Sequence, residues 1–349
     1  MPFRLPVRFA AAIGLAAAVL AGCADAPTVI APPPPPQAPA VTLSPRLVEL
    51  ASAYRSYVEA TSAISPAFAD AEGVQRSLST GVAYEPNQMV RGAIAYAAVV
   101  ALQDRAFVEG VRVYAKDPTQ RGQVAYEILK DPAYAIGLQG SASAAGLVIA
   151  TMGGEAQRLY DGGKAVKQSA YEIQKQPWSK SEAPAPMRDA RLANAKSLST
   201  TAMRGDVNQT ARLQQASTGA ASLGLSAQAA APPYTPTVVR GLAVAALAVL
   251  GQAGDANVDQ VMGLMAEPNV GSCMSMSKLN LYQCLAVARP HYEDVFCLGQ
   301  HAMMDTGRCM IRAAGLPEPH EPRFVPSAAS AAKGYPAKKP PPKKGRRKS

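Results

Sequence analysis

The stretch PAYAIGLQGSASAAGLVIATMGG, residues 132–154, contains no charged residue and decides between a membrane-inserted and a packed helical fold. Its 23 residues are long enough to cross a bilayer. Polar side chains interrupt the stretch, however, and small residues recur at every fourth position, at Gly137, Ser141 and Ala145. A face of small residues lets two helices approach closely. The stretch therefore predicts a helix buried against its neighbours, and a membrane-inserting helical protein through 133–153 is the alternative.

Hydrophobic spacing indicates helices throughout the body of the chain. Apolar residues recur three or four positions apart, and runs that alternate Val, Ile or Thr with polar residues are rare. Ser44-Pro45 is a typical helix start. The pattern predicts one long helix over 86–115 and a short turn at 305–307. The predicted fold class is all-α: an irregular helical bundle with a disulfide-stapled C-terminal helical unit and disordered termini.

The first 22 residues have the features of an export signal. Arg4 and Arg8 precede an uncharged, mostly apolar stretch that is too short to span a bilayer. The stretch ends in Leu20-Ala21-Gly22-Cys23, which resembles the lipobox of bacterial lipoproteins. This resemblance implies cleavage before Cys23 and attachment of lipid to Cys23. Ala24 follows Cys23. In the enteric version of this class, an aspartate at that position retains the protein in the inner membrane, so the resemblance implies export to the outer membrane.

Proline-rich stretches and changes in charge divide the chain into segments. Pro32–Pro36 belong to a run that favours an extended polyproline II spacer after Cys23. The predicted segments are a lipoprotein signal peptide (1–22), a proline-rich tether (23–44), an N-terminal helical domain (45–176), a linker with a polar helix (177–237), a C-terminal helical unit with four cysteines (238–325) and a disordered basic tail (326–349).

Four cysteines, Cys273, Cys284, Cys297 and Cys309, lie close together near the C-terminal end. An even number of cysteines in an exported chain predicts two disulfides, for which three connectivities exist. Pro290 interrupts the helical pattern between Cys284 and Cys297, and a reversal of the chain there would bring these two together. This favours the nested pairing, in which Cys273 joins Cys309. Sequential pairing remains open.

Eight of the ten net positive charges come from the C-terminal end of the chain, and the other two are Arg4 and Arg8. Residues 333–349 contain eight basic residues and no acidic one, whereas the rest of the mature chain is balanced. An extended polycation is attracted to anionic surfaces, so we expect binding to lipopolysaccharide, anionic lipid or peptidoglycan. A neutral body gives no reason to expect specific nucleic-acid binding. The predicted polyanion-binding residues are Lys338, Lys339, Lys343, Lys344, Arg346, Arg347 and Lys348.

The sequence contains no catalytic motif, and no C-x-x-C pair of the kind that structural zinc sites and redox dithiols use. No cofactor or metal is predicted. The prediction is a non-enzymatic envelope lipoprotein, a tether or an assembly or scaffold factor on the periplasmic side of the outer membrane. Its partners would be the membrane, through Cys23, and an unidentified protein. The alternative is a periplasmic enzyme or ligand-binding protein with acid–base groups near His291, His301 and Asp305.

Overall fold

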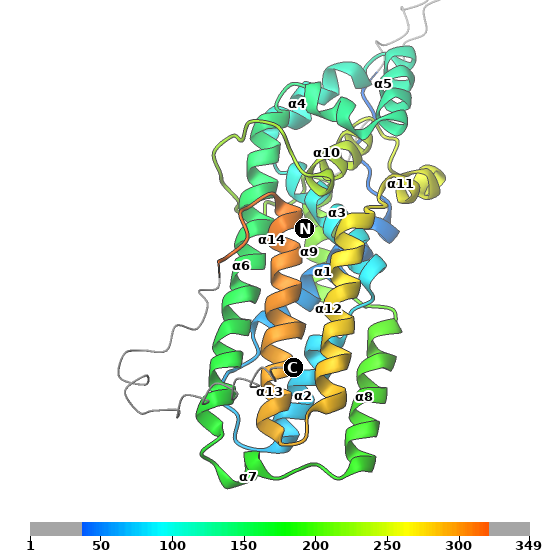
Figure 1. Ribbon diagram of the computed structural model, residues 1–349. Helices are drawn as coiled ribbons and strands as arrows, with labels where there is room; N and C mark the ends of the chain where they lie inside the picture. Colours follow the sequence, from blue (N-terminus) through cyan, green and yellow to red (C-terminus); the bar gives the residue numbers. More distant parts are fainter. Residues whose placement is uncertain (1–36, 321–349) are drawn as a thin grey trace, which may run out of the picture. The chain divides into compact units, whose positions relative to one another are not determined.

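The computed structural model describes residues 37–320, and this part of the chain is all-α, as predicted (Figure 1). The predicted signal peptide, most of the predicted tether, the basic tail and the predicted disordered termini lie outside the described residues. The elements up to the longest helix are α1 (Pro45–Ser62), α2 (Ala71–Val82), α3 (Pro86–Ala101), α4 (Arg105–Ala115), α5 (Pro118–Lys130), the 3-10 helix η1 (Pro132–Gly137) and α6 (Ser141–Ile173). The elements that follow are α7 (Pro177–Lys180), α8 (Ala185–Thr200), α9 (Val207–Ser217), α10 (Pro236–Val249), the 3-10 helix η2 (Asp255–Asn257), α11 (Val258–Leu264), α12 (Pro268–Val287), α13 (His291–Cys297), the π-helix η3 (Leu298–Asp305) and α14 (Thr306–Ala314).

Capping residues in the sequence set many of the helix starts. Ser44 accepts a hydrogen bond from the backbone N–H of Arg46 at 3.3 Å, and Pro45 is the first residue of α1, as predicted. The same arrangement recurs where Asp117 precedes the proline that opens α5, and where Thr235 precedes the proline that opens α10. Proline fits the first helical turn because the N–H it lacks would have no partner there.

The predicted single helix over 86–115 is wrong, because the chain forms two helices that are separated at residues 102–104. Asp104 causes the break, since its carboxylate accepts a hydrogen bond from the N–H of Phe107 at 2.8 Å and starts α4 anew. The predicted turn at 305–307 is also wrong. The chain remains helical there, because η3 continues directly into α14.

The centre of the core is formed by two apolar helices, α3 and α10, and most residues of both are buried. The two helices cross at Gly241, where an added Cβ would lie only 2.5 Å from the Cβ of Ala97. α1 packs on the other side of α3 in the same manner, with Gly92 against the backbone carbonyl of Leu50. The many alanines and glycines of the sequence therefore serve close helix contacts in a dense core.

The stretch 132–154 is divided between η1 and the first half of α6. Gly140, between the two elements, has a φ of 83°, which favours glycine. Ala144, Ala145 and Val148 are fully buried, so the prediction of a buried helix is confirmed. Among the described residues, no helix is both long enough and apolar enough to cross a membrane.

The helices α13, η3 and α14 form one continuous column that lies between α6 and α12 (Figure 1). α6 also packs against α1, α3 and α10, so it contacts helices from both ends of the chain. The helices before and after the segment 177–237 belong to one compact unit and share one continuous core. The column of α13, η3 and α14 carries His291, His301, Cys297 and Cys309, and the other two cysteines of the body lie on α12.

Candidate functional site

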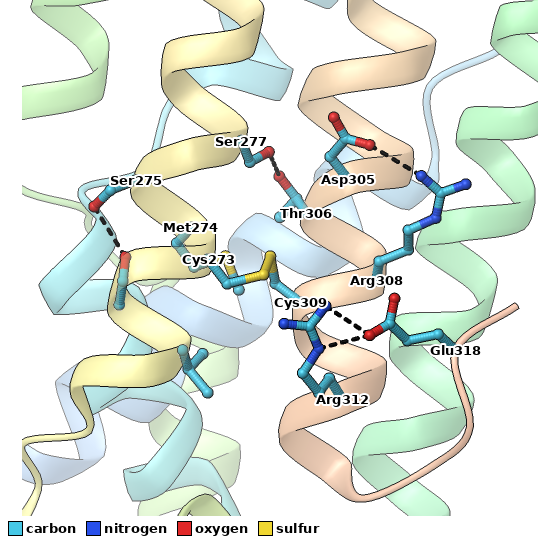
Figure 2. Close-up of a disulfide and its surroundings, with 12 residues drawn as sticks. Cys273, Met274, Ser275, Ser277, Asp305, Thr306, Arg308, Cys309, Arg312 and Glu318 are labelled. Carbon is cyan, nitrogen blue, oxygen red and sulfur yellow. Dashed lines mark hydrogen bonds and ion pairs between the residues drawn. A yellow bond between two sulfur atoms is a disulfide. The ribbon is translucent and has the colours of Figure 1, made fainter.

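All four cysteines of the body are bonded in pairs. Cys273 on α12 joins Cys309 on α14, with 5.8 Å between their Cα atoms, and Figure 2 shows this bond linking the two helices. Cys284 on α12 joins Cys297 at the end of α13, with a Cα separation of 5.7 Å. This is the nested pairing, and it arises because Pro290 directs the chain back after α12 ends. The predicted disulfide-stapled C-terminal unit is therefore confirmed.

A buried polar network lies beside the Cys273–Cys309 disulfide. The hydroxyl of Thr306 is 3.1 Å from the hydroxyl of Ser277, as Figure 2 shows, and 3.0 Å from the hydroxyl of Tyr84. Ser277 also donates to the backbone carbonyl of His301 at 2.7 Å. Burial raises the pKa of Tyr84 to about 12, so its hydroxyl stays protonated and can donate. Because each hydroxyl has a partner, the network links α12 to η3 and α14.

Lys278 is a buried lysine next to this network, and its side chain reaches across to the end of α2. Its Nζ atom donates to the backbone carbonyl of Val82 and lies 3.5 Å from the centre of the Tyr84 ring. Burial lowers the pKa of Lys278 to about 6, with a smaller opposing effect from Glu85. Lys278 lines none of the five cavities described in residues 37–320.

His301 and Asp305 form a pair on one face of η3. The Nδ1 atom of His301 is 2.8 Å from Oδ2 of Asp305. Gln300 donates to the other carboxylate oxygen at 3.0 Å and Arg308 at 3.3 Å. The carboxylate of Asp305 is thus already occupied by three neighbours.

His291 belongs to a different cluster, at the start of α13. Its Nδ1 atom is 3.7 Å from Oδ2 of the fully buried Asp294, which also pairs with the buried guanidinium of Arg191 on α8. Burial raises the pKa of the Asp294 carboxyl, and its contacts with His291 and Arg191 oppose this rise. Arg191 additionally donates to the carbonyls of Leu285 at 3.2 Å and Ala288 at 3.0 Å. The structure therefore does not bring His291 together with His301 and Asp305 in one site.

A second polar site is formed by residues of α1, α3, α6 and α9, and the sequence gave no indication of it. We call it the arginine pocket: a cavity of about 430 Å³ into which Arg55, Arg158 and Arg212 project. α1 contributes Arg55, α3 contributes Tyr96, α6 contributes residues 150–158 and α9 contributes Gln209 and Arg212. The segment 223–226 closes one side.

The base of the arginine pocket is a buried carboxylate, Glu155 on α6, which is 4 % exposed. Its Oε1 atom is 2.8 Å from the guanidinium of Arg55 and accepts a hydrogen bond from the hydroxyl of Tyr96 at 2.9 Å. Burial raises the pKa of the Glu155 carboxyl, and the charges of Arg55 and Arg158 act against this rise. The carboxylate thus fixes Arg55, whose guanidinium also lies over the Tyr96 ring, 5.5 Å from its centre.

Sequence analysis missed the arginine pocket because its charged residues come from separate helices. Only the i,i+3 spacing of Glu155 and Arg158 on α6 is visible in the sequence, and such pairs are common on helix surfaces. Within residues 37–320, no three His, Cys, Asp or Glu side chains are grouped in a way that could hold a metal ion. Cys23 and the predicted polyanion-binding residues of the tail lie outside the described residues.

Comparison of the chain with models of protein families, with curated proteins and with solved structures found no match.

Proposed function

We propose that this protein is an exported, lipid-anchored envelope protein that acts without catalysis as a tether or assembly factor on the periplasmic side of the outer membrane. The observation that carries the proposal is the use of the cysteines. Four of the five cysteines of the chain form the two disulfides of the body, which leaves Cys23 as the one available for another purpose. Disulfides are typical of proteins that fold in an oxidising compartment such as the periplasm.

The chemistry of Cys23 supports an anchor. A thiol can carry a lipid through a thioether, and each buried methylene group adds about 0.8 kcal/mol of membrane affinity. A single acyl chain gives only marginal binding, so a stable anchor needs several chains. The proline-rich segment that follows would separate the helical body from the lipid. The chain joins that body at residues 42–44, where Thr42 and Ser44 donate backbone hydrogen bonds to the carbonyls of Ala248 and Ala253 at 3.0 and 2.8 Å.

Labelling with an alkyne analogue of palmitate in the producing bacterium tests the anchor. The unaltered protein is expected to take up the label and to sediment with membranes, and Cys23→Ser is expected to lose the label and to leave the membrane fraction. The matched variant Ala24→Asp keeps Cys23 and should keep the label while moving toward the inner-membrane fraction of a density gradient. A Cys23→Ser variant that is still processed and still sediments with membranes would contradict the proposal.

A tether also needs a second attachment, and the basic tail is the proposed one. Deletion of 333–349 removes eight cations and no anion, so it should reduce co-sedimentation of the protein with purified peptidoglycan or lipopolysaccharide at low salt. Sedimentation that does not change on this deletion would exclude the tail as the second attachment.

A further inference from the structure

The arginine pocket contains more positive charge than the protein itself neutralises. The carboxylate of Glu155 is matched by Arg55, at 2.8 Å. Arg158 and Arg212 also line the cavity, and neither forms a hydrogen bond or ion pair with another described residue. The wall also contains uncharged polar residues, among them Thr151, Gln209 and Ser226. The pocket therefore holds two uncompensated guanidinium groups.

The position of these two arginines is set from both sides of the cavity. Arg158 is one helical turn from Glu155 on α6, and its charge acts on the Glu155 carboxyl. Arg212 is on α9, and its charge acts on the Tyr96 hydroxyl at the base of the pocket. Both guanidiniums thus lie close to the Glu155–Tyr96 pair, although they come from different helices.

The walls of the pocket are held by contacts of their own. The N–H of Leu223, in the segment 223–226, donates to the side chain of Gln103 at 3.0 Å. Shortly after this segment, the N–H of Ala230 donates to the carbonyl of Ala142 on α6 at 2.9 Å. Gln209 of α9, which also lines the cavity, donates to Glu59 of α1 at 2.6 Å. The cavity is consequently formed without a ligand, and its size falls in the range of small-molecule sites, roughly 300–1,000 Å³.

One oxygen at the base of the pocket is buried without a partner in residues 37–320. The Oε2 atom of Glu155 is buried and has no hydrogen-bond partner among the described residues. Arg55 and Tyr96 satisfy only one oxygen of this buried carboxylate. Burying the other oxygen without a partner costs free energy of folding, so a contribution to stability alone does not explain Glu155. It is accounted for if its task is to orient Arg55 beside the two other arginines.

We propose that the arginine pocket binds a small organic dianion, held by Arg158 and Arg212 with Arg55 completing the cationic surface. Two unpaired guanidiniums match two negative charges, and the planar fork of arginine donates to phosphate and carboxylate groups in a bidentate manner. The ligand class is a phosphate monoester or a dicarboxylate. It is a free molecule rather than a membrane surface, because the arginines surround a cavity between helices. This inference does not depend on the lipid anchor.

Titration calorimetry on the full-length protein in nonionic detergent tests the proposal, at 0.15 M NaCl to screen the basic tail. Inorganic phosphate and succinate are the dianionic probes, and acetate is the monoanionic comparison. At least one dianion is expected to bind, and acetate is expected to bind at least tenfold more weakly. Tighter binding of phosphate than of succinate would indicate a phosphate ligand, and tighter binding of succinate would indicate a dicarboxylate.

Variants with matched charge changes locate the site. Arg158→Gln and Arg212→Gln are each expected to weaken binding of the dianion at least tenfold. Two controls, the exposed Arg289→Gln between α12 and α13, which does not line the pocket, and Arg204→Gln in the cleft between α1, α3 and α9, should change it less than twofold. Equal losses in all four variants would show diffuse charge attraction and overturn the proposal.

Two further outcomes would also overturn it. One is the absence of binding by both dianions to the unaltered protein. The other is a protein that binds neither dianion but binds phosphatidylglycerol vesicles, and loses this vesicle binding in Arg158→Gln and Arg212→Gln. The ligand would then be a membrane headgroup.

Discussion

At the scale of single residues, the buried pair of Arg191 and Asp294 has the largest expected effect on stability. Both side chains are almost fully buried, and they join α8 to α13. Asp294→Asn would leave the charge of Arg191 in the core without a counter-charge, so it should lower the free energy of unfolding by about 3–5 kcal/mol. Replacing both residues, by Arg191→Met with Asp294→Leu, should recover most of this loss. Urea denaturation measures both effects.

The control for this prediction is an exposed ion pair of the same type. Arg46 and Asp259 are 3.2 Å apart, with side chains that are 58 % and 90 % exposed. Asp259→Asn should therefore change stability by less than about 1 kcal/mol. Equal effects of the two Asp→Asn substitutions would mean that burial is not what makes the Asp294 pair important.

Lys278 is expected to make stability depend on pH. Its pKa is about 6 in the folded protein, against 10.5 for an ordinary lysine, so between these values the folded protein holds it neutral and unfolding takes up a proton. Raising the pH through this range therefore disfavours unfolding, by up to about 1.4 kcal/mol per pH unit. Lys278→Met should remove this slope between pH 6.5 and 9 in urea titrations and raise stability most at the lower pH. The exposed-lysine control Lys130→Met should retain the slope, and a slope that survives in Lys278→Met would refute the assignment.

At the scale of elements, the contact of α6 with η3 depends on two glycines. An added Cβ on Gly299 would lie 2.4 Å from the backbone nitrogen of Lys167, and one on Gly163 would lie 2.8 Å from the backbone nitrogen of Met304. Backbone atoms cannot move aside as the end of a side chain can. The π-helix therefore packs on α6 with almost no space between the two backbones.

The neighbouring glycines Gly162 and Gly163 provide a matched test of this contact. Gly163→Ala should destabilise the protein by about 1–3 kcal/mol through overpacking. Gly162→Ala should be neutral or stabilising by up to about 1 kcal/mol, because its Cβ would lie 3.4 Å from the flexible end of Met303 and 3.7 Å from the carbonyl oxygen of Ser62, without a clash, and alanine favours the helix. Thermal unfolding of the two variants gives the comparison. Similar losses in both would mean that the helix, and not the contact, is sensitive to the substitution.

At the scale of the whole body, α6 contributes to a core that helices from both ends of the chain share. No separate core exists for the helices after residue 237 among the described residues. We therefore expect unfolding to be cooperative across the body. Trp178, the single tryptophan, lies beside His291 with 6.5 Å between the ring centres, and so reports on the disulfide-bonded end. Its fluorescence and the far-ultraviolet circular dichroism should change at the same urea concentration. Two distinct midpoints would indicate independent domains.

The sequence by itself determined the helical class, many of the helix starts and the nature of the cysteine block. These features depend on neighbours in the chain: the spacing of apolar residues, a capping side chain before a proline, and Pro290 between two cysteines. The sequence could not predict the π-helix, because packing on α6, and not the composition of the segment, stabilises the extra residue in each turn.

Only the tertiary structure decided which charged residues act together. Arg55, Glu155, Arg158 and Arg212 come from three helices, and each is ordinary in its own sequence context. The separation of His291 from His301 and the burial of Lys278 were likewise set by packing. The physical reason is that burial and charge pairing depend on which helix faces meet, and residues distant in the chain set this as much as near ones.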